Sequence, residues 1–119
     1  MTAGPRGFPK AARLRTRQEF LRVQQQGFKV SGQYLLALAL RRDAGTPRVG
    51  LTVSNKVGIA VVRNRLRRMM RELVRHNLAA FPDAHDVVFI VSPKAAAANP
   101  ALVRAEFARV LVDVSRRAK

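Results

Sequence analysis

Cysteine and tryptophan are absent from the sequence, and acidic residues are scarce. Without cysteine the protein has no disulfide, no thiol nucleophile and no zinc site built on thiolates, which is typical of the cytoplasm. Long apolar runs are also missing, since none approaches the roughly 20 residues that a membrane helix requires. The first 30 residues alternate basic and apolar residues rather than forming the apolar segment of a signal peptide. We therefore expect a cytoplasmic protein that neither crosses a membrane nor is exported.

The charge balance indicates a polyanionic partner. Apolar residues make up 48% of the 119 residues, which suits one folded domain with a single core over 1–119. Against 23 Lys and Arg stand seven Asp and Glu, so the net charge is +16 at pH 7. An excess this large repels itself, and an anionic partner relieves the repulsion. Nucleic acid is the leading candidate, and an anionic membrane surface is the second.

The positive charge is concentrated in two segments. Residues 1–29 and residues 56–75 each hold seven basic residues and one glutamate, so together they carry +12 of the +16. Codon bias accounts for part of the preference for arginine over lysine, but it does not account for this clustering. The two segments are therefore the candidate binding surfaces.

Local signals predict three helices around one small sheet. Glycines and prolines near the start predict a mobile basic arm over 1–12. Thr16 and Glu19 have the spacing of a capping box and predict a helix over 16–26 that ends at Gly27. Further helices are predicted at 61–80, stopped by Pro82, and at 100–116, where Asn99 and Pro100 supply the start. Extended segments are predicted at 28–40, 48–54 and 87–91. The order predicts an α+β or α/β sandwich, with 35–40 and 48–54 paired in a hairpin and Leu102 and Ala105 on the buried side of the last helix.

The helix predicted at 61–80 has two contrasting faces. Its apolar stripe comprises Val62, Leu66, Met69, Met70, Leu73 and Leu78. The opposite face carries Arg63, Arg67, Arg71 and Arg75 four residues apart, with Arg65, Arg68 and Glu72 beside them. A solvated helix face normally mixes acidic with basic residues, so this pattern favours a polyanion-binding face. Lys56 and Gly58 precede the helix in a turn where an ammonium group and backbone N–H groups would attract an anion.

The strand and turn before this helix share a motif with a known family. The run 48–54 reads Arg-Val-Gly-Leu-Thr-Val-Ser, and it is followed by Lys56, Gly58, Ala60, Val61 and the run 63–68, Arg-Asn-Arg-Leu-Arg-Arg. This segment resembles the RNR signature of the bacterial ribonuclease P protein component, and the resemblance extends over nearly the whole chain. It implies an α+β, two-layer sandwich of a four-stranded sheet and three helices in the order α-β-β-β-α-β-α. It also implies a left-handed crossover between 48–54 and 87–91, against the usual right-handed rule.

The resemblance implies an RNA-binding subunit rather than an independent catalyst. In this family the RNA subunit removes the 5′ leader of precursor tRNA, with Mg²⁺ bound mainly by that RNA and the substrate. The expected partners are the catalytic RNA and precursor tRNA, with no protein partner required. The expected RNA-docking residues are Lys56, Arg63, Asn64, Arg65, Arg67, Arg68 and Arg71. No catalytic residue and no metal-ligating side chain is expected on the protein, although Asn64 is placed near an RNA-bound ion.

The family also holds the single-stranded leader in a cleft between the first helix and the sheet. By resemblance the cleft residues are Arg13, Arg15, Arg17, Phe20 and Val23. Without the resemblance, a lone phenylalanine on a helix would be interpreted as ordinary core. The chain departs from the family pattern at three positions: Gln24 and Leu38 stand where aromatic residues are frequent, and Asn55 where a lysine is frequent. Leader contacts are therefore expected to be less aromatic here.

Four other functions compete with this interpretation. An independent metal-dependent nuclease needs convergent carboxylates, and the seven acidic residues show no paired spacing. His76 and His85 could serve acid–base chemistry, but we expect the first to be solvated on the basic helix and the second to lie in a turn. A helix-turn-helix DNA-binding protein needs two adjacent helices, whereas strands interrupt the predicted pairs. A ribosomal role fits the composition equally well, and a membrane-surface role fits the amphipathic helix.

Overall fold

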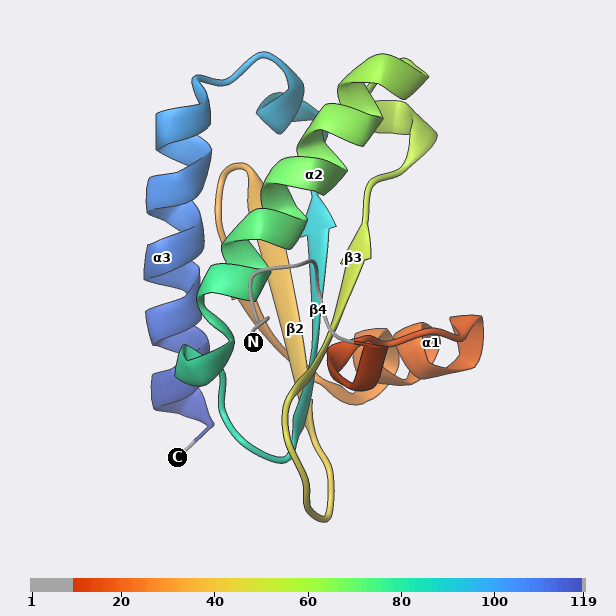
Figure 1. Ribbon diagram of the computed structural model, residues 1–119, viewed down its shortest axis with the longest axis vertical. Coiled ribbons are helices and arrows are strands. Elements are labelled where there is room, and N and C mark those ends of the chain that lie inside the picture. The colour runs from red at the N-terminus through yellow and green to blue at the C-terminus, as the bar shows by residue number, and fades with distance from the viewer. Residues whose placement is uncertain (1–9, 119) are drawn as a thin grey trace.

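A four-stranded sheet organises residues 10–118, the part of the chain that the computed structural model describes. The strands are β1 (Phe28–Ser31), β2 (Leu35–Arg41), β3 (Arg48–Thr52) and β4 (His85–Val91), and their order in the sheet is β1-β2-β4-β3. The pairs β1–β2 and β2–β4 are antiparallel, whereas β3 and β4 are parallel. Figure 1 shows β2 and β4 side by side at the centre.

The hairpin predicted between β2 and β3 is wrong, because β4 lies between them. Six of the seven β4 residues are buried, so this strand takes a central place where both faces are covered. The connection from β2 to β3 instead passes the start of β4. The N–H of Arg42 donates to the carbonyl of Ala84 at 2.6 Å, and the N–H of Ala84 donates to the carbonyl of Gly45 at 2.8 Å.

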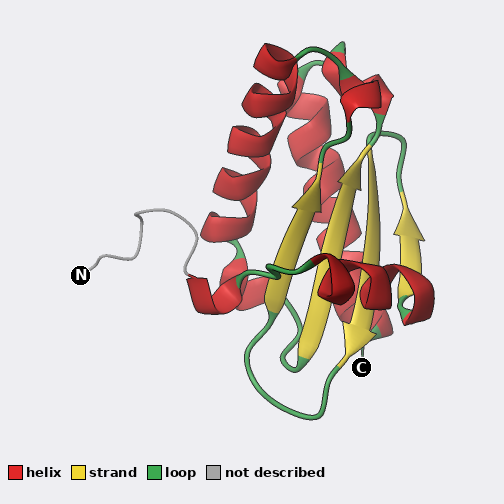
Figure 2. Ribbon diagram, turned by 90° about the vertical axis from the view of Figure 1, so that its right-hand side faces the viewer, coloured by secondary structure: helices red, strands yellow, loops and turns green. Residues whose placement is uncertain are grey.

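Three helices cover the sheet on its two faces. They are α1 (Arg17–Gln26), α2 (Ala60–His76) and α3 (Pro100–Arg117), with short 3₁₀ turns η1 (Lys10–Ala12), η2 (Asn55–Val57), η3 (Leu78–Ala80) and η4 (Pro93–Ala96). Figure 2 shows α1 crossing one face while the two longer helices pack on the other. The predicted α+β class, the strand number and the element order are confirmed. The left-handed sense of the crossover from β3 through α2 to β4 stays a prediction.

The main core lies between the sheet and helices α2 and α3. Alternate strand residues point into it, and the rings of Phe81, Phe89 and Phe107 meet at centroid distances of 5.1 to 6.5 Å. A second, smaller core lies beneath α1 and consists of Leu14, Val23, Leu38 and Val88. Because α1 has only ten residues, it covers only part of its face of the sheet.

Several local predictions are corrected by the structure. The predicted arm over 1–12 lies mostly outside the described residues, but its last three residues form η1. Helix α2 ends at His76, where the Asn77 side chain donates to the carbonyl of Leu73 at 2.7 Å and begins the turn into η3. Leu102 and Ala105 are exposed, because the buried stripe of α3 is formed by Val103, Phe107, Val110, Leu111 and Val114. His85 is buried in β4 rather than in a turn, because the strand begins two residues earlier than predicted.

No helix within residues 10–118 is long and apolar enough to span a bilayer. The longest, α3, keeps charged residues along its exposed side and packs its apolar stripe into the main core. The hydrophobic faces of the helices are therefore used for packing on the sheet.

Glu106 of α3 holds the turn between β1 and β2. Its carboxylate accepts the backbone N–H groups of Gln33, Tyr34 and Leu35, each at 2.7 Å. Gly32 makes room for this contact, because a Cβ atom there would lie 2.5 Å from the carboxylate. One anionic side chain thus satisfies three donors that would otherwise lack partners in the turn.

Replacing Glu106 by glutamine should destabilise the protein by about 3 kcal/mol, because a neutral amide cannot accept three hydrogen bonds as strongly and directs an N–H group at other donors. Urea unfolding monitored by circular dichroism measures the change. The control is Glu72→Gln, which removes an exposed carboxylate from a surface ion pair and should leave stability nearly unchanged. Equal effects of the two substitutions would contradict the structural role of Glu106.

Candidate nucleic-acid interface

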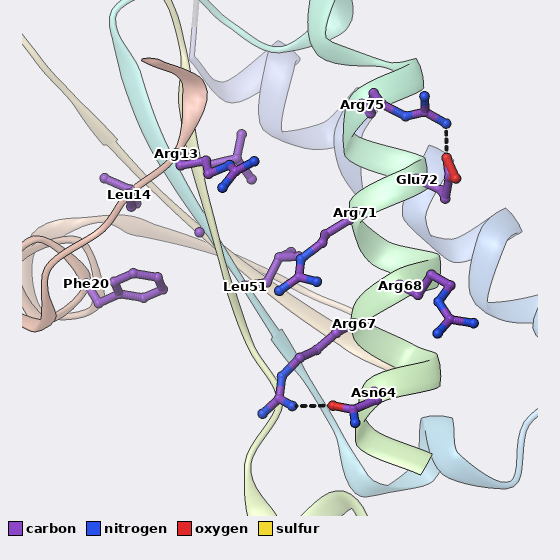
Figure 3. A pocket seen from close by; sticks show the side chains of 12 residues that line it. Arg13, Leu14, Phe20, Leu51, Asn64, Arg67, Arg68, Arg71, Glu72 and Arg75 are labelled. Carbon is purple, nitrogen blue, oxygen red and sulfur yellow. Dashed lines mark hydrogen bonds and ion pairs between the residues drawn. The ribbon is translucent and has the colours of Figure 1, made fainter. Parts of the chain in front are cut away.

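A groove of 980 Å³ runs between α2, β3 and the segment that leads into α1. We call it the α2–β3 groove. Its α2 wall is formed by Asn64, Arg67, Arg68, Arg71, Glu72 and Arg75, and its opposite wall by Arg13, Leu14, Phe20, Val49, Gly50 and Leu51. Figure 3 shows Arg71 reaching from α2 towards Leu51, and Arg67 lying beside Asn64, with Phe20 on the far side of the groove. A cationic wall therefore faces a largely apolar one.

The α2 wall follows from the helical period of the sequence. Leu66, Met70 and Val74 are fully buried in the main core, which turns the arginines at intermediate positions outward. Arg67 is held in place, since its Nη1 donates to Asn64 Oδ1 at 3.0 Å and its Nη2 donates to the carbonyl of Val53 at 3.2 Å. Arg71 is exposed and has no hydrogen-bond partner among residues 10–118, so its guanidinium can reach a ligand.

The apolar wall depends on a glycine in β3. The Phe20 ring lies over Gly50, where a Cβ atom would come within 2.5 Å of the ring. The N–H of Leu14 donates to the carbonyl of Val49 at 3.0 Å and fixes the segment before α1 along the β3 edge. Phe20 is partly exposed, so one face of its ring can stack on a planar group in the groove.

A partly buried ion network, centred on the buried Asp86, fixes α1 beside this groove. Asp86 of β4 is 2% exposed, and it accepts from Arg48 Nε and Nη2 at 2.9 and 2.8 Å and pairs with Arg42 Nε at 2.8 Å. Arg48 also donates from Nη1 to Glu19 Oε2 at 2.9 Å. The other oxygen of Glu19 accepts the N–H groups of Arg15 and Thr16, which completes the predicted capping box. The start of α1, and with it Phe20, is thereby tied to the sheet.

The hydrogen bonds from the backbone N–H groups of Thr16 and Arg15, together with the charge of Arg48, lower the pKa of Glu19 below its ordinary value of 4.5. Since the folded-state pKa is the lower one, the stabilisation is complete above the ordinary value and is lost as the pH falls through the folded value. Glu19→Gln should therefore be less stable than the wild type at about pH 6, and the difference should be smaller at about pH 3, below the ordinary pKa.

Urea midpoints at both pH values test this expectation, with Asp43→Asn as the control because Asp43 is exposed in the β2–β3 connection. A difference between wild type and Glu19→Gln that is the same at both pH values would contradict it.

The structure brings together residues from both predicted surfaces. Arg13 and Phe20, from the expected leader cleft, line the same groove as Asn64, Arg67, Arg68 and Arg71 from the expected docking helix. Lys56 lies in η2 ahead of α2 and is exposed, and Arg63 donates to Asn55 Oδ1 at 2.7 Å. Arg65 lies outside the α2–β3 groove and donates to the carbonyl of Ala96 at 3.1 Å. Asn55, one of the three departures noted in the sequence, therefore orients Arg63.

The remaining leader-cleft residues differ in their exposure. Arg15 and Arg17 are exposed at the start of α1, whereas Val23 is fully buried in the small core with Leu38. The placement of Val23 in the cleft is corrected on this point, because a side chain with no exposed surface supports the cleft from below and cannot contact RNA. Leu38 is likewise core, so an aromatic residue there would have to be accommodated beneath α1.

Sequence reasoning missed part of the groove. Leu14, Gly50 and Leu51, which form much of the apolar wall, were not among the expected site residues, whereas Arg75 of the predicted polyanion-binding face closes the α2 wall beside Glu72. A glycine inside a strand of β-branched residues often marks a place where another group approaches the backbone closely. This signal could have identified Gly50 as part of the groove. The positions of Leu14 and Leu51 depend on how the segment before α1 docks on β3, which local patterns do not specify.

Within residues 10–118, no group of three or more His, Cys, Asp or Glu side chains is arranged to hold a metal ion. Asn64, which was expected near an RNA-bound ion, has its Oδ1 beside the Arg67 guanidinium. A positive group at this distance disfavours a cation at the same oxygen. The arrangement of the groove favours anions.

A small α+β domain whose arginine-lined helix faces an apolar wall has the construction of an RNA-binding protein, since arginines can pair with phosphates and the apolar wall can receive bases. Comparison with known proteins agrees. The family described as Ribonuclease P matches residues 8–115. The ribonuclease P protein component of Desulforapulum autotrophicum is 34% identical over 113 residues, covering 95% of this chain and 97% of the relative. That of Acidothermus cellulolyticus is 39% identical over 105 residues, covering 87% and 88%.

The solved structure of the ribonuclease P protein from Thermotoga maritima superposes with a TM-score of 0.75 at 30% identity, covering 83% of this chain and 94% of that one. The chain therefore belongs to the family of ribonuclease P protein components. It is a subunit of the ribonucleoprotein endoribonuclease that processes tRNA, and its partner is the ribonuclease P RNA. The resemblance drawn from the RNR segment is confirmed, and the ribosomal, DNA-binding and membrane alternatives are set aside.

Proposed function

We propose that the α2–β3 groove is where the catalytic RNA and the 5′ leader of precursor tRNA meet on this subunit. The α2 wall, with Arg67, Arg68 and Arg71, would dock on the phosphates of the catalytic RNA. The opposite wall, with Phe20 and Leu51, would receive bases of the single-stranded leader. The observation that carries the proposal is that one groove joins an arginine wall to a wall with an accessible aromatic ring.

The proposal extends to the exposed basic residues around the groove. Lys56 and Arg63 would add phosphate contacts at the start of α2, and Arg13, Arg15 and Arg17 would do so along the leader. Arg65 faces away from the groove, so its contact would be with RNA that crosses over α2. The net charge of +16 supports phosphate contacts that extend beyond the groove itself.

Mg²⁺ enters this proposal through the RNA. Phosphate and base oxygens of the catalytic RNA and the substrate would bind the ions, which supply charge stabilisation at the scissile phosphate. The contribution of this chain would be to hold the two RNA segments together and to neutralise their repulsion. The Mg²⁺ sites of the RNA would then be filled at a lower Mg²⁺ concentration. No side chain of the protein is assigned a bond-breaking role.

Cleavage of precursor tRNA at low Mg²⁺ tests the proposal. Catalytic RNA alone should be nearly inactive, and addition of the wild-type protein should restore removal of a long single-stranded leader. Phe20→Ala should weaken binding of the long-leader substrate about tenfold, the loss of one stacked base, while a substrate with a one-nucleotide leader should be unaffected. The control is Leu21→Ala, which shortens a 38% exposed side chain outside the groove.

Three results would contradict the proposal. Failure of the wild-type protein to restore cleavage would remove the assisting role. Equal effects of Phe20→Ala on long and short leaders would remove the leader from this wall. Cleavage by the protein without RNA would overturn the assignment of catalysis to the RNA subunit.

A further inference from the structure

A second groove lies on the other side of α2, between α2, α3 and the η4 turn. Its volume is 660 Å³, within the roughly 300–1,000 Å³ that small-molecule sites occupy. We call it the α2–α3 groove. It shares Arg65 and Arg68 with the expected RNA-docking residues, whereas its apolar floor and Arg104 belong to neither surface expected from the sequence.

The floor of this groove is apolar. Val103 and Ala95 are fully buried beneath it, and the half-buried side chains of Met69, Leu73 and Ala98 pack on the main core. A flat apolar group could lie on such a floor without leaving a buried polar atom unpaired. Met69 adds a polarisable sulfur, which interacts favourably with aromatic rings.

The rim of the groove is cationic. Arg65, Arg68, Arg75 and Arg104 surround the floor, with Glu72 as the one acidic residue of the lining. Arg68 and Arg104 are exposed and have no hydrogen-bond or ion-pair partner among residues 10–118. An occupant must therefore combine an apolar planar body with negative charge at its edge. A second copy of the chain does not fit this requirement, because each copy carries a charge of +16.

The two grooves share one ridge. Arg68, Glu72 and Arg75 line both the α2–β3 groove and the α2–α3 groove, so an RNA strand whose phosphates follow this ridge passes the mouth of each. A nucleotide that is unpaired at this point can turn its base away from the ridge while its phosphate stays on the arginines. The apolar floor then replaces the stacking that the base loses.

We infer that the α2–α3 groove receives one unpaired base of the catalytic RNA that docks on α2. The base lies on Met69 and Leu73, and the flanking phosphates contact Arg68 and Arg104. The inference rests on the proposed docking of that RNA along α2, and it adds a second contact to it. It also gives Arg65 a role, because its bond to the carbonyl of Ala96 holds η4 against α2 at one end of the groove.

Filling the groove tests the inference on the assembled complex. Ala98→Leu places a larger side chain over the floor, and Ala101→Leu makes the same change at an exposed position of α3 outside the groove. The affinity for the catalytic RNA should fall about tenfold in the first variant, because the base loses its apolar contact with the floor, and stay within about twofold in the second. Circular dichroism and urea midpoints of both variants show whether the fold is kept.

Methyl NMR provides a direct reading of the groove. The protein has three methionines, of which Met69 lines the groove and Met70 is fully buried in the adjacent core. With ¹³C-methyl-methionine labelling and assignment by Met69→Leu, a single-stranded oligoadenylate should shift the Met69 methyl upfield by its ring current. A probe of the same length with abasic sugars should not, and the Met70 methyl serves as the internal reference.

The outcomes separate the inference from the proposed function. If Ala98→Leu binds the catalytic RNA as tightly as Ala101→Leu, or if the abasic probe shifts Met69 as much as oligoadenylate does, base insertion is excluded while docking on α2 stands. If the wild type does not bind the catalytic RNA at all, both fail. A Met69 shift that depends on protein concentration alone would assign the groove to a second copy and overturn the inference.

Discussion

Substitution of Asp86 by alanine should remove about 3–5 kcal/mol of stability, because it leaves two arginines without their shared partner in a largely buried place. Asp86 is 2% exposed, and it meets Arg42 and Arg48 at 2.8 to 2.9 Å. Domains of this size are stable by roughly 5–15 kcal/mol, so a large part of the total would be lost. Urea unfolding in the absence of RNA measures the effect.

The triple variant Asp86→Ala with Arg42→Met and Arg48→Met provides the control. It removes all three charges together, and replacing a buried ion network by apolar side chains is often nearly neutral, so much of the lost stability should return. Hydrogen exchange of the α1 backbone gives a second reading, since Arg48 also holds Glu19. An Asp86→Ala protein that unfolds at the same urea concentration as the wild type would show that the network does not hold the fold together.

Replacing Arg68 and Arg71 together by glutamine should weaken binding of the catalytic RNA by about thirtyfold or more at low salt, because two phosphate contacts are lost. These two arginines are exposed on α2, and neither has a partner among residues 10–118, so their removal should leave stability nearly unchanged. The plot of log affinity against log salt should also become shallower, by about one to two units of slope.

Filter binding over a series of salt concentrations measures both quantities. The matched control is Arg41→Gln with Arg116→Gln, which makes the same change of charge at exposed positions outside the α2–β3 groove. If the control pair weakens binding as much as the α2 pair, the contribution is that of net charge and the docking surface is not on α2. Lysine at positions 68 and 71 should retain most of the salt dependence and lose part of the affinity, since it keeps charge without the planar fork.

Local signals in the sequence were sufficient for most elements of the fold. Thr16 and Glu19 cap α1 as their spacing predicts, and Asn99 caps α3 by accepting the N–H of Ala101 at 2.9 Å. Such capping contacts join residues only a few positions apart, so the local sequence is enough to predict them. The order of the strands does not follow from local patterns, because the place of β4 between β2 and β3 depends on which strand gains most from being covered on both faces.

In the candidate site, too, one wall could be predicted from local patterns and the other depends on tertiary contacts. The arginine face of α2 follows from the helical period once the apolar stripe is known. The opposite wall requires three segments to meet, with Gly50 of β3 beneath the ring of Phe20 and Leu14 bonded to the β3 edge. The burial of Val23 could not be predicted either, because it depends on the angle at which the network of Arg48 and Glu19 holds α1 against the sheet.

The two outer strands of the sheet each meet an arginine from a helix. On β1, Arg117 donates to the carbonyl of Lys29 and its guanidinium lies 4.8 Å from the centre of the Phe28 ring. Just beyond β3, Arg67 donates to the carbonyl of Val53. Within β3, the carbonyl of Val49 accepts a hydrogen bond from the backbone N–H of Leu14. Backbone groups at open sheet edges are the usual starting points for intermolecular strand pairing and fibril growth. The protein should therefore resist β-aggregation during the interval between its synthesis and its assembly with RNA. The side chains that cover the sheet edges would act there in addition to the repulsion between molecules of high net charge.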